Sequence, residues 1–117
     1  MTCERFTVVR VPFPFTDREA SRNRPALVLS ASGAFNAPVG HAVMAMITSA
    51  TNAPWPLDHT VRNLEAAGLP APSVVRGKLF TLDLRLVRGE LGTLADADQA
   101  GVETMLRALL GMRSEAP

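Results

Sequence analysis

The sequence RPALVLS at residues 24–30 is the stretch that decides the fold. Residues 25–30 are almost entirely apolar, and since successive side chains of a strand point to opposite faces, this run predicts a β-strand buried on both faces. Arg24 stands at the mouth of this strand, where a permanently charged side chain meets the buried run. We therefore expect a buried strand with a guanidinium at its rim.

Segments of related character flank this strand on both sides. They are apolar, β-branched or alternating, and glycines and prolines separate them at short intervals, which is typical of an all-β domain. Pro12 and Pro14 each lack a backbone donor, so the first segment should lie at a sheet edge or at a strand exit. The third segment ends in Thr48 and Ser49, so Thr48 and Arg24 could lie near one rim. The six predicted strands span residues 6–13, 25–30, 42–49, 57–62, 73–79 and 86–91.

Helical signals are confined to two places. Residues 63–69 resemble one helical turn closed by Gly68, a residue suited to a left-handed C-cap. Residues 96–110 have apolar side chains at three- and four-residue spacing, which predicts a helix with one face toward the core, although Gly101 costs about 1 kcal/mol relative to alanine. The apolar face consists of Val102, Met105, Leu106, Leu109 and Leu110. These elements predict one mainly β domain over residues 1–117, with a short helical turn and a C-terminal α-helix.

Composition limits the classes of protein to consider. A chain of 117 residues, 47% of them apolar, fits one domain. Its 12 basic and 11 acidic residues leave a net charge of +1, so no whole-molecule field indicates nucleic acid, and any anion site must be local. Cys3 has no cysteine partner, and no cysteine or histidine pair has the spacing of a structural zinc site. We expect a cytoplasmic protein without metal or other cofactor, and no membrane span, because no apolar run approaches roughly 20 residues.

Several motifs together carry a family resemblance. The sequences VPFPFTD at residues 11–17, RPALVLS at 24–30 and ITS at 47–49 resemble, in order and spacing, motifs of the MazF/PemK toxins. Residues 72–76, residues 78–83 and the GTL at 92–94 before the last helix are similar to the same family. The resemblance implies an SH3-like small β-barrel of the MazF/CcdB type and a homodimer. It also implies a type II toxin, an mRNA interferase that cleaves single-stranded RNA without metal and is inhibited by a MazE-like antitoxin.

The resemblance also names candidate catalytic residues whose chemistry suits the reaction. Arg24 aligns with the family's catalytic arginine, and its planar guanidinium matches phosphate oxygens. Thr48 aligns with the catalytic threonine and can donate and accept hydrogen bonds. Neither side chain is a general base at ordinary pH, which leaves Glu19, a histidine (His41 or His59) or water. We take Glu19 as the candidate base, because some members of the family share its spacing from the arginine.

Other side chains are candidates for RNA contacts. Trp55 stands between two prolines and could stack an RNA base, although it could equally pack a dimer. Arg76 and Lys78 alternate on one strand face and could line an RNA groove, or form a solvated basic edge that discourages aggregation. Arg24 itself could merely pair with an acidic residue of the preceding loop. The full set of predicted RNA-binding residues is Arg22, Ser49, Phe15, Trp55, Arg76 and Lys78.

A second reading comes from a different class of protein. A toxin of the same barrel type, as CcdB is, could bind and poison DNA gyrase without cleaving RNA. Such a binder would not need Arg24 and Thr48, so their presence favours the ribonuclease.

Overall fold

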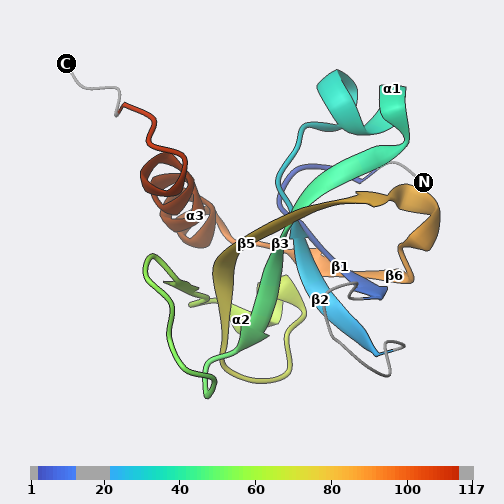
Figure 1. The fold of residues 1–117 in the computed structure, drawn as a ribbon. Coiled ribbons are helices and arrows are strands. Elements are labelled where there is room, and N and C mark those ends of the chain that lie inside the picture. Colours follow the sequence, from blue (N-terminus) through green and yellow to red (C-terminus); the bar gives the residue numbers. More distant parts are fainter. Residues whose placement is uncertain (1–2, 13–21, 114–117) are drawn as a thin grey trace.

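The computed structural model describes residues 3–12 and 22–113, and within them the chain forms one curled, antiparallel sheet of six strands (Figure 1). The strands follow the order β4-β5-β3-β2-β1-β6 across the sheet. Their bounds are Thr7–Pro12 (β1), Asn23–Val28 (β2), His41–Ser49 (β3), His59–Thr60 (β4), Ser73–Asp83 (β5) and Gly89–Thr93 (β6). The mainly β prediction is therefore confirmed.

The strand β2 is buried on both faces, as the apolar run predicts. Leu27 and Leu29 belong to a buried cluster that includes Val102 and Met105 of the C-terminal helix. The alternating neighbours Ala26 and Val28 belong instead to the cluster on the opposite face, with side chains from β1 and β3. Because these two clusters lie on opposite faces of the sheet, the buried part of β2, from Ala26 to Val28, is packed on both of its faces.

One prediction about the strands is confirmed and another is wrong. The strand β1 ends at Pro12, which is the strand exit that was one of the two predicted placements of the prolines; β1 itself lies between β2 and β6 and is not an edge strand. The last strand was expected at residues 86–91, but Leu84–Leu86 form a 3-10 turn and β6 begins at Gly89. The side chain of Asp83 accepts a hydrogen bond from the backbone N–H of Arg85, and this local bond starts the turn whose last residue, Leu86, the strand pattern had included in the last strand.

The helices follow the predicted pattern with one addition. The helix α2, Leu64–Ala67, is closed by Gly68 in the left-handed conformation, and α3 spans Asp96–Leu109. Leu110 lies beyond the end of α3 and is exposed, so it does not belong to the buried face. The segments η1, Ser32–Asn36, and α1, Ala37–Val39, were not predicted. No helix in the described ranges is long and apolar enough to cross a membrane.

Gly101 lowers the helix propensity of α3, but the packing of α3 against β4 requires a glycine at this position. A Cβ atom at this position would lie 2.2 Å from Cε1 of His59. The close approach of α3 to β4 therefore requires the absence of a side chain here. Figure 1 shows α3 standing beside β5 at the end of the sheet where β4 lies.

Candidate active site at one end of β2 and β3

The sheet register brings Arg24 and Thr48 together. Ala26 of β2 pairs with Met46 of β3, and continuing this antiparallel register by two residues places Arg24 opposite Thr48. Opposite residues of an antiparallel pair project from the same face. Both residues line one pocket with a volume of about 190 Å³. Its other lining residues are Pro25, Ile47 and Ser49 of the two strands, and Leu69, Pro70, Ala71, Pro72 and Ser73 on the approach to β5. The expectation that Arg24 and Thr48 share a rim is confirmed.

The guanidinium of Arg24 carries an unsatisfied donor. Arg24 is half-buried, and its Nε is buried without a hydrogen-bond partner among the described residues. An unpaired N–H removed from water costs free energy that a bound acceptor would recover. The alternative partners, Asp17 and Glu19, lie outside the described residues, as does Phe15. Within the described ranges, Arg24 is thus a cation with donor capacity left for a ligand.

The hydroxyl of Thr48 is held by a residue that the sequence analysis did not single out. Thr48 is only 6% exposed, and its Oγ1 accepts a 2.7 Å hydrogen bond from Nδ2 of Asn52. The turn after β3 brings Asn52 back, because its backbone N–H donates to the carbonyl of Ser49 at 3.1 Å. Asn52 follows Thr48 by four residues in a polar turn, and only that local polarity could have indicated it. The bond orients Oγ1 and leaves the hydroxyl proton available to a second group.

Ser49 and Arg22 lie at the border of this site. Ser49 lines the pocket; its Oγ lies 2.8 Å from Oγ1 of Thr51 and accepts a hydrogen bond from the Thr51 backbone N–H. Arg22 is exposed immediately before β2, two residues from Arg24. A ligand that is longer than the pocket could therefore contact both residues where it leaves the pocket.

Arg76 is buried and engaged, unlike the solvated basic edge considered from the sequence. It is 6% exposed, and its Nε and Nη2 donate to Oδ1 and Oδ2 of Asp58 at 3.1 and 2.9 Å. Nη2 also donates to the carbonyl of Ala53 at 2.9 Å. Burial alone would raise the pKa of Asp58, but the hydrogen bonds from Arg76 and from the Trp55 backbone prevail and lower it. Arg76 thus joins β5 to the loop that connects β3 and β4.

Trp55 lies on that loop, beside both basic residues of β5. The guanidinium carbon of Arg76 is 4.8 Å from the centroid of the Trp55 ring, and Nζ of Lys78 is 6.0 Å from it. Both distances fall within the range of cation–π interactions. Trp55 as a whole residue nevertheless remains 45% exposed. The structure therefore combines a half-open aromatic ring with positive charge.

Neither histidine lies among the residues that line the pocket. His59 is half-buried, and its Nε2 lies 2.9 Å from Oδ1 of Asp98 in α3. His41 begins β3, at the end of the strand opposite Thr48. The histidine alternatives for the base thus gain no support from the geometry.

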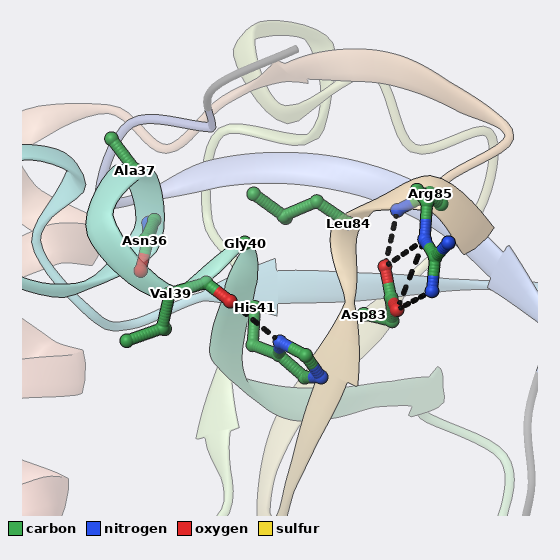
Figure 2. Close-up of a pocket in the computed structure, with 8 residues that line it drawn as sticks. All are labelled: Asn36, Ala37, Val39, Gly40, His41, Asp83, Leu84 and Arg85. Carbon is green, nitrogen blue, oxygen red and sulfur yellow. Dashed lines mark hydrogen bonds and ion pairs between the residues drawn. The ribbon is translucent and has the colours of Figure 1, made fainter.

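His41 belongs to a larger pocket at that opposite end, with a volume of about 420 Å³ (Figure 2). Its charged groups bind each other: Nη2 of Arg85 donates to Oδ2 of Asp83 at 2.7 Å. Nδ1 of His41 lies 2.9 Å from the carbonyl of Val39 and, as the only possible donor, donates to it. Polar groups that already bind each other offer less to a ligand than the unsatisfied Nε of Arg24. Size alone therefore does not make this the candidate site.

A comparison with known protein families finds a match over most of the chain. Residues 4–110 match the model of a family described as PemK-like, MazF-like toxin of type II toxin-antitoxin system. No curated protein sequence is significantly similar to the chain.

Solved structures provide closer detail. MazF from Deinococcus radiodurans is 27% identical, with a TM-score of 0.74 over 96% of this chain and 99% of that chain. A MazE-MazF complex from the same organism is 26% identical, with a TM-score of 0.75 over 97% of this chain and 100% of that chain. An endoribonuclease from a mycobacterial species, 20% identical, reaches a TM-score of 0.75 over 100% of this chain and 97% of that chain, which shows the shared fold.

Proposed function

This chain belongs to the PemK-like, MazF-like toxins of type II toxin–antitoxin systems, and on that premise we propose that it is a sequence-specific endoribonuclease acting on single-stranded RNA. One observation carries the proposal: Arg24, whose Nε is unsatisfied within the described ranges, and Thr48, whose hydroxyl is oriented by Asn52, line the same pocket. A phosphodiester provides the acceptor oxygens that this pair lacks. The apolar walls from residues 69–72 suit the sugar and base beside that phosphate.

The proposed reaction is attack of a ribose 2′-hydroxyl on the adjacent phosphorus, without a metal ion. The bond from the 2′-oxygen to phosphorus forms as the bond to the 5′-oxygen breaks, giving a 2′,3′-cyclic phosphate and a 5′-hydroxyl end. Arg24 donates to the non-bridging oxygens, where negative charge develops in the transition state. Thr48 orients the phosphate or the attacking hydroxyl. Glu19 is the proposed acceptor of the 2′-proton, and the leaving oxygen takes a proton from the protonated base or from water.

RNA beyond the scissile phosphate would follow the surrounding residues. We propose that Ser49, Arg22 and Phe15 contact the nucleotides on either side of the scissile phosphate. Trp55 would stack a base, and Lys78 would contact the backbone. The charge of the whole chain is only +1, so this local set must supply the attraction for RNA.

The proposed protein partners are a second copy of the chain and a MazE-like antitoxin. The complexes of MazF with MazE from Deinococcus radiodurans, at 26% identity, support the antitoxin. A disordered segment combining acidic and apolar side chains would cover the basic residues of the site.

The decisive experiment maps the cleavage of a long single-stranded RNA in the presence of EDTA. The expected result is cleavage at one short recurring sequence, with 2′,3′-cyclic phosphate ends. Arg24→Ala and Thr48→Ala should each lower kcat by about 100-fold or more, because each removes a group aimed at the transition state. Arg85→Ala is the matched control, since Arg85 is exposed and pairs with Asp83 at the opposite end of the sheet.

A substrate with a 2′-deoxy sugar at the cleavage position separates this mechanism from others. It should bind and remain intact, because the attacking oxygen is absent. Cleavage of that substrate would exclude 2′-hydroxyl attack. Intact RNA under conditions where expression still arrests growth would refute the ribonuclease and favour a toxin that binds gyrase.

A further inference from the structure

Arg76 of β5 makes several hydrogen bonds to the loop at residues 50–58, which joins β3 to β4. Arg76 reaches it with two nitrogen atoms, which bind both carboxylate oxygens of Asp58 and the carbonyl of Ala53. The two charged side chains are 7% and 11% exposed. Breaking one partner of so buried a pair would leave the other charge uncompensated. The loop conformation therefore depends on Arg76.

The same contacts fix the position of Trp55. Oδ2 of Asp58 accepts a 2.9 Å hydrogen bond from the Trp55 backbone N–H, and the indole packs on the guanidinium of Arg76. Leu57 lies between Trp55 and Asp58 in the sequence and has a φ of 71°. A non-glycine residue adopts this backbone conformation only when its surroundings hold it there. The ring is thus held in place while 45% of the residue stays exposed.

We propose that Arg76 is a positioning residue, which holds the loop at residues 50–58 so that Trp55 forms a preformed platform for one base of the RNA. This inference rests on the proposed ribonuclease function and names the part of that site that selects a nucleotide. Arg76 does not contact the RNA backbone, because a phosphate could reach its Nε and Nη2 only by displacing Asp58. The base gains stacking area on a ring that is already ordered, so binding costs little conformational entropy.

The first test needs no RNA, because Trp55 is the only tryptophan of a chain without tyrosine. Its fluorescence therefore reports on this loop alone. Arg76→Met and Asp58→Asn should both increase quenching by acrylamide, because the indole becomes more accessible. Arg85→Met is the matched control, because Arg85 is exposed, pairs with Asp83 at the opposite end of the sheet and should leave quenching nearly unchanged. Equal quenching in the wild type and in both loop variants would overturn the positioning role.

The second test compares the KM for RNA in Asp58→Asn, in Arg76→Met and in the wild type. If Arg76 positions Trp55, Asp58→Asn and Arg76→Met raise KM together, by about 10- to 100-fold, the range of base stacking on an aromatic ring. The value of kcat should stay close to wild type, since Arg24 and Thr48 are untouched. If Arg76 instead bound phosphate, Asp58→Asn would free the guanidinium and lower KM, which would overturn the proposal.

Salt dependence separates the two roles again. Removing a phosphate contact on single-stranded RNA reduces the slope of log affinity against log salt by about 0.7. For an uncleavable 2′-O-methyl RNA, the slope of log affinity against log salt should be the same in Arg76→Met as in the wild type. In Lys78→Met the slope should be smaller by about 0.7. A reduced slope in Arg76→Met would assign it a direct contact and refute the inference.

The variants must also be shown to fold, by circular dichroism and thermal unfolding. If Arg76→Met does not fold, Asp58→Asn and the conservative Arg76→Lys carry the same tests, with Arg76→Lys expected to recover part of the KM. Trp55→Ala in combination with Asp58→Asn should bind RNA no more weakly than Trp55→Ala alone. Additive losses would overturn the proposal. The two proposals can also fail separately. If the loop variants show increased quenching but the wild type cleaves no RNA, Arg76 positions Trp55 and the ribonuclease is refuted.

Discussion

Oδ1 of Asp98, in the first turn of α3, lies 2.9 Å from Nε2 of His59 in β4. The carboxylate is fully buried and also accepts hydrogen bonds from the backbone N–H groups of Arg62 and Asn63, at 2.9 and 3.0 Å. One side chain therefore joins α3 to β4 and to the start of α2. A negative charge at the N-terminus of α3 is also favoured by the helix dipole.

Asp98 is expected to make the stability of the protein depend on pH. Burial raises the pKa of Asp98, but the hydrogen bonds from Asn63, Arg62 and His59 prevail and lower it below its ordinary 3.8. A carboxyl with a lower pKa in the folded state adds stability that is complete above its unfolded pKa and is lost as pH falls through its folded pKa. The advantage of the wild type over Asp98→Asn should be present at about pH 5 and shrink toward about pH 3. Urea unfolding at each pH measures this, and a difference independent of pH would contradict it.

Gly101→Ala is expected to destabilise the protein in spite of alanine's higher helix propensity. The added Cβ would lie 2.2 Å from the His59 ring, which is held by Asp98. Overpacking of this kind costs about 1–3 kcal/mol, more than the roughly 1 kcal/mol that propensity returns. Gly33→Ala is the matched control, because no atom lies within 4 Å of its added Cβ. Equal unfolding midpoints for the two variants in urea would show that α3 can move away without cost.

Arg24→Met is expected to separate stability from activity. Its Nε is buried without a partner in the described part of the chain, so replacing the guanidinium by an apolar side chain removes an unsatisfied donor. The free energy of unfolding should stay the same or rise by up to about 1 kcal/mol, while RNA cleavage is lost. Chemical denaturation checks this. A loss of stability above about 1 kcal/mol would instead assign Arg24 the structural ion pair considered from the sequence.

Asn52→Ala is expected to lower kcat through Thr48. The variant removes the donor to Thr48 Oγ1 but keeps the backbone bond from residue 52 to Ser49. A net hydrogen bond of about 1 kcal/mol corresponds to roughly a fivefold change in rate. In a Thr48→Ala background the same substitution should have no further effect on kcat. Single-turnover cleavage of a short RNA measures both variants, and independent effects would show that Asn52 acts elsewhere.

Periodicity along the chain was sufficient for the elements whose signals are local. The run at residues 25–30 predicted a strand with two buried faces, and the apolar spacing at residues 96–110 predicted α3, because strand and helix geometry alone sets which side chains share a face. The resemblance of ordered motifs identified the family and the pair Arg24 and Thr48. Glu19 and Phe15 lie outside the described residues, so their assigned roles stay predictions.

Only the tertiary structure decided which side chains meet. The sequence predicted that Arg76 lines an RNA groove or a solvated basic edge, yet Arg76 is buried and paired with Asp58, 18 residues earlier in the chain. From the sequence, Gly101 only lowers the helix propensity of its segment. In the structure, the ring of His59 occupies the space that a side chain at position 101 would need. Such pairings depend on sheet register and on the packing of elements distant in sequence, which no local period encodes. The sequence by itself determined most of the elements, the family and the chemistry available at one rim; the tertiary structure determined which groups are paired and which are left to bind.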